Sequence, residues 1–149
     1  MTHVRQQIRE RVATNVTGLT TTGSRVYQSR VYNLEAANLP GLLIYSNDET
    51  SERSSIGLLA DQDLERTLDL VIEGYASTAS NLEDVLDLIA EEVETAVAAD
   101  PTCNGLSKDL FLSGTSISLT GEGDSPAGVL ALTFQVSYRT TTTAPGTAL

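Results

Sequence analysis

The chain has 149 residues, a formal net charge of −11 and a hydrophobic content of 40%. This length suits one domain with its own core, and the composition is typical of a folded globular chain. The acidic balance argues against a surface that holds nucleic-acid phosphates over most of its area. The single cysteine, Cys103, excludes an internal disulfide framework. No run reaches the ~20 apolar residues of a membrane span, so we expect no membrane association.

The first third of the chain predicts one helix and two strands. Residues 3–17 are predicted to be helical because apolar residues recur every fourth position before Gly18. Residues 24–34, SRVYQSRVYNL, are rich in strand formers. Residues 39–45, LPGLLIY, form a continuous apolar run, which is typical of a strand buried on both faces.

Residues 47–61, NDETSERSSIGLLAD, are predicted to be a long irregular loop. Loops of this length often carry function in compact domains. Its apolar residues Ile56, Leu58 and Leu59 favour contact with a partner, because exposed apolar groups are otherwise unfavourable. The alternative is a solvated connection without a role.

Residues 62–77 alternate as a long strand, with Leu64, Leu68, Leu70 and Ile72 on one side. We interpret Gly74 in this strand as the site of a bulge.

The clearest element is the helix predicted over residues 80–100, SNLEDVLDLIAEEVETAVAAD. Ser80 and Glu83 have the spacing of a capping box, and Asp100-Pro101 ends the segment. Its apolar residues form a single stripe, which we expect to be buried. The members of this stripe are Leu82, Val85, Leu86, Ile89, Val93, Ala96 and Val97.

The last third predicts strands. Residues 110–112 and 117–119 are predicted to be two short strands around a turn at Ser113-Gly114, and residues 129–140 are the last strand. The order of elements predicts an α+β fold, a single mostly antiparallel or mixed sheet with two main helices packed on it. We expect one domain over residues 1–140 and a flexible tail over 141–149.

No constellation of catalytic residues is visible. His3 is the only histidine and lies near the chain start, and there is neither a glycine-rich phosphate loop nor a cysteine pair. We therefore expect no enzymatic activity and no cofactor. Glu65, Asp69 and Glu73 share a strand face, but neighbours four apart lie about 13 Å from one another, too far to bind one ion.

A weak Mg²⁺ or Ca²⁺ site built from Asp48, Glu49, Asp61 and Asp63 stays open as an alternative, although a solvated acidic face is favoured.

The charge is unevenly distributed. Residues 1–30 are basic, whereas no Lys or Arg occurs between Arg66 and Lys108. These two regions are complementary either within one copy or between neighbouring copies.

Four segments resemble the tail terminator proteins of long-tailed bacteriophages, the family of the lambda minor tail protein U. They are MTHVRQQIRERV, SRVYQSRVYNLEAANLPGLLIYSNDET, LDLVIEGYAS followed by SNLEDVLDLIAEEVETAV, and VLALTFQVSYRTTTTAP. Together they cover most of the chain. The resemblance implies a virion protein, assembled in the host cytoplasm, that forms a ring, typically a hexamer, on the tail tube. Such a ring stops tube growth and joins the tail to the head, so its partners are further copies, the tail tube protein and a head-tail connector or neck protein.

This resemblance suggests three sets of site residues. The contacts between copies are expected at Arg5, Arg9, Arg11, Arg25 and Arg30. Contact with the tube or connector is expected at Ser51, Arg53, Ile56, Leu58 and Leu59. An acidic lumen, through which DNA passes without specific binding, is expected at Glu65, Asp69 and Glu73 or at Glu91, Glu92 and Glu94.

Two other interpretations stay open. The first is a head-tail connector, neck protein or tail tube subunit, of which the tube subunit would form stacked polymers. The second is a small cytosolic α+β ligand-binding module or enzyme, which would be a stable monomer with an enclosed pocket.

Overall fold

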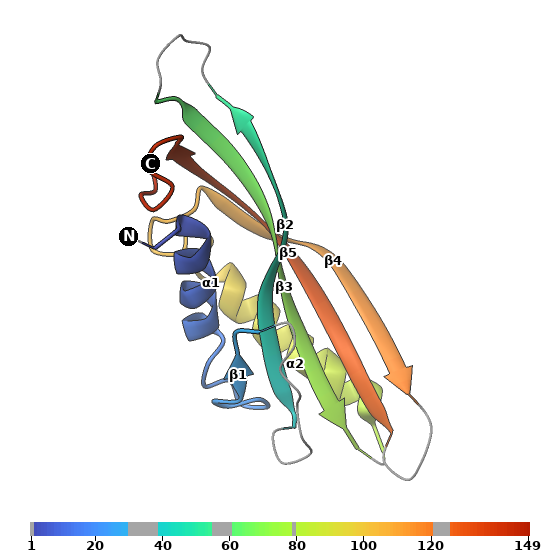
Figure 1. The fold of residues 1–149 in the computed structure, drawn as a ribbon. Coiled ribbons are helices and arrows are strands. Elements are labelled where there is room, and N and C mark those ends of the chain that lie inside the picture. Colours follow the sequence, from blue (N-terminus) through green and yellow to red (C-terminus); the bar gives the residue numbers. More distant parts are fainter. Residues whose placement is uncertain (1, 30–38, 55–60, 79, 121–125) are drawn as a thin grey trace.

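A computed structural model describes residues 2–29, 39–54, 61–78, 80–120 and 126–149. Its elements, in chain order, are α1 (Val4–Asn15), β1 (Val26–Tyr27), β2 (Gly41–Arg53), β3 (Asp63–Ser77), α2 (Leu82–Ala98), β4 (Asp109–Thr120) and β5 (Ala127–Thr141). The strands form one sheet in the order β1-β2-β3-β5-β4 (Figure 1). β1 and β2 are parallel and every other pair is antiparallel. The predicted α+β fold with a mixed sheet and two helices is confirmed.

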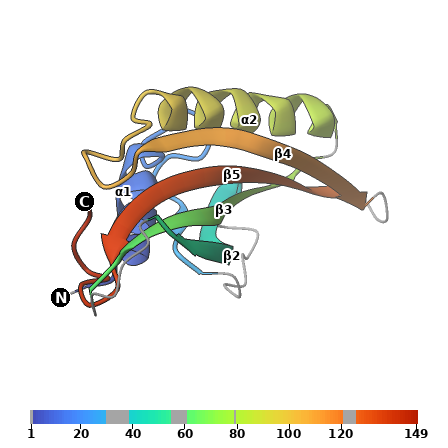
Figure 2. The same cartoon turned by 90° about the horizontal axis from the view of Figure 1, so that it is seen from above.

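The core lies between one face of this sheet and the two helices (Figure 2). Strand alternation sends Leu130, Leu132, Phe134, Val136 and Tyr138 of β5 to this face, and all five are buried, as the sequence predicts. The apolar residues of β3 stand beside them in register. We call this side the helix face and the opposite side the open face, because no helix among the described residues packs against it.

The apolar stripe of α2 is confirmed, with Leu86, Ile89, Val93 and Val97 buried against the sheet. The predicted capping box is wrong. The helix begins at Leu82, and its N-cap is Asn81, whose backbone is left-handed with φ of 51° and whose side chain makes no capping bond. The chain reverses sharply between β3 and α2, and Asn tolerates the left-handed conformation needed there.

The predicted loop over residues 47–61 is wrong for its first half, because β2 continues to Arg53. Glu49 pairs with Leu68 and Arg53 with Leu64, so the strand follows β3 through its polar residues. The register shifts between Ser46 and Glu49, which is a bulge in β2. In Figure 1 this hairpin projects past the helices. Ile56, Leu58 and Leu59 lie outside the described residues.

The other strand boundaries also differ from the prediction. Of residues 24–34, Val26–Tyr27 alone forms a strand within the described part, and residues 30–38 are not described. β4 is one continuous strand, since Ser113-Gly114 is a register shift rather than a turn. Gly74 is not a bulge, because its pairing with both neighbours is regular. A β-carbon at Gly74 would lie 2.8 Å from Ile89 Cγ2, so the missing side chain lets α2 approach β3.

The chain beyond β5 folds back along the start of the chain. The Val4 amide donates to the Pro145 carbonyl at 2.9 Å, and the Leu149 amide donates to the Arg139 carbonyl at 3.0 Å. Figure 1 accordingly shows the two termini at the same end of the molecule. The division into a domain over residues 1–140 and a flexible tail stays a prediction.

Gly74→Ala tests the close approach of α2. We expect it to lower the free energy of unfolding by about 1–3 kcal/mol, because Ile89 is buried and its branched side chain has to shift. Gly114→Ala in β4 is the matched control, since a β-carbon there meets no atom within 4 Å, and we expect a change within about 0.5 kcal/mol. Urea denaturation of both variants gives the comparison, and equal stabilities would contradict the packing described.

Candidate functional site

A charged cluster joins four elements on the helix face. The bulge in β2 turns Glu49 inward, where its carboxylate accepts hydrogen bonds from Arg5 of α1 at 2.6 Å and from Arg66 of β3 at 3.3 Å. The Tyr138 hydroxyl of β5 donates to the second carboxylate oxygen. The Glu49 side chain is 10% exposed and that of Arg66 is 12% exposed. We call these four residues the Glu49 cluster.

Two further contacts hold Arg66 in the Glu49 cluster. Arg66 Nε donates to Thr140 Oγ1 at 3.0 Å, and the guanidinium lies 6.0 Å from the centre of the Tyr138 ring, within cation–π range. Burial, and then the hydrogen bond to Glu49, raises the pKa of Tyr138 above its ordinary value. The Glu49 carboxylate thus accepts from two cations and a phenol of the same chain, and these contacts connect α1, β3 and β5 to β2.

His3 sits beside this cluster as the N-cap of α1. Its Nδ1 accepts the Arg5 amide proton at 3.1 Å, which requires an unprotonated Nδ1. Burial, and then the charges of Arg5 and Arg66, lower the pKa of His3. The histidine therefore caps a helix within this chain.

Two of the arginines expected between copies are paired within the chain. Arg5 joins the Glu49 cluster, and Arg11 Nε donates to Asp100 Oδ2 at 2.8 Å. The bond from Arg11, followed by that from Asn15, lowers the pKa of Asp100. These pairs attach α1 to the sheet and to the chain after α2.

The remaining basic residues of this set differ in their surroundings. Arg25 donates to the backbone carbonyls of Pro40 and Thr21, whereas Arg9 donates to Gln28 Oε1, at 3.3 Å. Arg30 lies outside the described residues. A role for this set between copies stays a prediction.

The expected lumen residues of β3 lie together on the open face. Glu65 pairs with Arg139 at 3.5 Å, and Asp69 stands opposite Gln135. Glu73 accepts hydrogen bonds from two phenols, the Tyr45 hydroxyl at 2.5 Å and the Tyr75 hydroxyl at 2.6 Å. Burial, and then Glu73, raises the pKa of Tyr75.

The three expected lumen residues of α2 do not share one surface. Glu91 is exposed, while Glu92 accepts the amide and hydroxyl protons of Thr21 from the neighbouring turn. Glu94 lies on the other side of the helix, beside Phe111 and Leu112 of β4. The α2 set and the β3 set are on opposite sides of the sheet, so one chain does not combine them into one wall.

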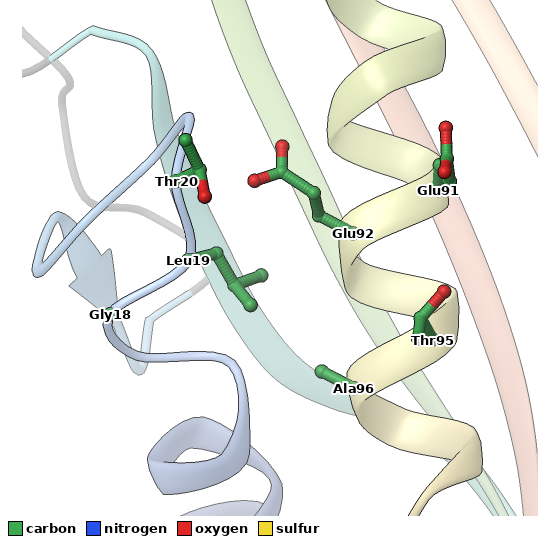
Figure 3. A pocket seen from close by; sticks show the side chains of 7 residues that line it. All are labelled: Gly18, Leu19, Thr20, Glu91, Glu92, Thr95 and Ala96. Carbon is green, nitrogen blue, oxygen red and sulfur yellow. The ribbon is translucent and has the colours of Figure 1, made fainter.

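A hollow of about 370 Å³ lies between α2 and the turn after α1 (Figure 3). Leu19 and Ala96 form its apolar part, and the Glu92 carboxylate points across it toward the turn. Thr20 and Thr95 at its rim are exposed. Since Glu92 is engaged by Thr21, the hollow presents no convergent polar set for a small ligand.

The described residues contain no group of three or more His, Cys, Asp or Glu side chains placed to hold a metal ion. Asp61, one of the four carboxylates considered for a divalent ion, accepts instead from the Thr143 amide at 3.1 Å. None of the helices that the structure describes has the length and hydropathy needed to cross a bilayer.

Two of the residues expected to contact the tube or connector, Ser51 and Arg53, lie in the described part of the chain. Both are exposed near the end of β2, in the β2–β3 hairpin that projects past the helices, which we call the β2–β3 arm. The Glu49 cluster and the two tyrosines on Glu73 were missed by sequence reasoning. Glu73 and Tyr75 do share a strand face at a spacing of two, which signals their contact. Nothing local signals that Glu49 turns inward, because the bulge decides it.

No protein-family model and no curated protein matches the chain. Among solved structures, the chain is similar to one from the "Virion of native gene transfer agent (GTA) particle". The two are 16% identical over 91% of this chain and 92% of that chain, with a TM-score of 0.36. A likeness of this strength assigns neither fold nor function.

Glu49→Gln tests the importance of the charged cluster. We expect a loss of about 3 kcal/mol in the free energy of unfolding, because the largely buried Arg66 loses its counter-charge, while the half-exposed Arg5 adds less. Glu65→Gln is the control, since its ion pair with Arg139 is exposed and is worth at most about 1 kcal/mol. If chemical denaturation finds the two losses equal, the cluster is not the constraint described.

The tyrosine pKa values predict a loss of stability at alkaline pH. An unfolded tyrosine loses its proton near pH 10, whereas Tyr138 and Tyr75 keep theirs to higher pH in the folded chain. The stabilisation is therefore complete below about pH 10 and is lost as the pH rises beyond it. We expect the free energy of unfolding to fall less steeply between about pH 9 and 11 in Tyr138→Phe than in the wild type. If the free energy of unfolding had the same pH dependence in both proteins, this role of Tyr138 would be refuted.

Proposed function

We propose that this chain is a structural virion protein, a tail terminator whose ring caps the tail tube, stops its growth and joins it to the head. The observation that carries the proposal is the open face of the sheet, which bears Glu65, Asp69 and Glu73 while both helices cover the other side. The sequence resemblance to tail terminators supports it independently.

The open face suits the lumen better than the back of α2 does. On β3, the three carboxylates line one strand at regular intervals. On α2, Glu91 is exposed while Glu92 and Glu94 lie on different sides of the helix, so the three carboxylates do not share one surface. An acidic wall repels DNA, so that DNA passes without being held.

The β2–β3 arm is the proposed contact with the tube or the connector. Ser51 and Arg53 are exposed there, and the arm projects past the helices (Figure 1). Among the described basic residues proposed between copies, Arg9 is the most available, since its hydrogen bond goes to the exposed side chain of Gln28 rather than to a carboxylate or the backbone. A closed ring needs such a patch to fit a different patch on the next copy.

Solution mass and images test this function. Light scattering over a range of concentrations, with negative-stain images of the same sample, should show a closed ring of six times the 15.8 kDa of one chain. Addition of the protein to growing tail tubes should then halt their elongation, while bovine serum albumin at the same concentration should not. Long tubes formed by this protein alone would instead identify a tube subunit. A protein that stays monomeric and leaves tube growth unchanged would exclude a terminator and favour the binding module.

A further inference from the structure

β4 is the outermost strand of the sheet, next to β5. Its residues from Leu110 to Thr120 contain neither a charge nor a proline. Natural proteins usually protect a long edge strand with lysine, proline, a covering segment or a strong bulge, because its free backbone groups otherwise pair with another chain. This edge has a single irregularity, between Leu112 and Gly114, and then pairs regularly with β5 to its end.

The edge is also apolar and open. Phe111, Ile117 and Leu119 are 47%, 49% and 47% exposed. Ile117 and Leu119 stand opposite Leu130 and Gly128, on the helix face, so they continue the core surface out to the edge of the sheet. Every residue from Ser113 to Leu119 is exposed, and no described strand pairs with the outer side of β4.

We propose that the stretch from Gly114 to Leu119 is paired with a strand of a second copy of this chain, and that this pairing is a contact between neighbours in the ring. The inference rests on the proposed function in taking the second copy as a ring neighbour. Backbone hydrogen bonds along the edge provide the contact, and Ile117 and Leu119 are covered by the incoming strand.

Charge favours a second copy at this position. Each chain carries a net charge of −11, so two copies repel wherever carboxylates meet. The back of α2 and the open face of β3 both bring carboxylates to the surface. β4 carries no charged residue from Leu110 to its end. A second acidic chain can therefore approach this edge without repulsion from carboxylates of β4.

The symmetry of a ring also limits which strand of the neighbouring copy can pair with β4. In a ring, each contact joins two different patches, so β4 meets a strand other than the neighbour's β4. A pairing of β4 with β4 would be two-fold and would close at two copies.

Ile117→Lys is the test, with Leu88→Lys as its matched control. Both replace a half-exposed apolar residue, at 49% and 47% exposure, but Leu88 lies on α2, away from the edge. A lysine on an edge strand opposes strand addition. We expect Ile117→Lys to need a concentration at least about tenfold higher for assembly, measured by light scattering, and Leu88→Lys to assemble as the wild type does. Circular dichroism and urea denaturation verify that both variants are folded.

Hydrogen exchange on the unmodified chain gives a second measurement that does not depend on a variant. The amides of residues 114–119 should exchange more slowly in rings, or on tube ends, than in dilute monomer. No added protection there would overturn the inference. So would rapid disulfide formation between two copies of Ser116→Cys, because it shows a two-fold β4 pair.

Failure of this inference is distinguishable from failure of the proposed function. If wild type and Ile117→Lys both form rings and both cap tubes equally well, the function stands and the edge contact is wrong. If the wild type neither associates nor caps tubes, the function is wrong. If the amides of residues 114–119 then also show no added protection from hydrogen exchange at the highest protein concentration, the edge contact is wrong as well.

Discussion

The inward position of Glu49 is the constraint on which the packing of α1 depends. α1 carries a narrow apolar stripe, and its start is held to the sheet by Arg5, whose charge is neutralised by Glu49. The same carboxylate binds Arg66, whose largely buried side chain would otherwise lack this counter-charge. Tyr138 completes the cluster from β5. One carboxylate thus fixes a helix and three strands relative to one another, and the β2 bulge is what brings it there.

The elements with strong periodicity could be predicted from the sequence. The α2 stripe and the alternation of β3 and β5 each bury one continuous row of side chains, and a displaced register would expose the whole row. These three elements determine the core and the α+β class. The position of Glu65, Asp69 and Glu73 on one face follows from the same alternation, so this part of the candidate site was predictable too.

The remaining features depend on contacts between distant residues. The polar half of β2 is predicted from the sequence to be a loop because its side chains are polar or charged. Its backbone is nevertheless stabilised as a strand by pairing with β3. Ser80 and Glu83 have the right spacing for a capping box, but in the reversal after β3 the N-cap is Asn81, in a left-handed conformation, and the helix begins at Leu82. The pairing of Arg11 with Asp100 joins residues 89 apart in the chain, which local sequence does not reveal.

The distribution of charge over the sheet also limits how copies can meet. The helix face is occupied by α1 and α2, and the open face carries the β3 carboxylates, so two copies that met open face to open face would bring like charges together. The edges of the sheet carry fewer charges. Within the described residues, β1 pairs with Leu42 and Leu43 of β2, and β4 is exposed from Ser113 to Leu119. In the proposed ring, copies that join at the sheet edges would keep the same face of each sheet toward the common axis, and the lumen proposed above requires that face to be the acidic one. The proposed edge contact and the proposed acidic lumen are therefore compatible with one arrangement of copies.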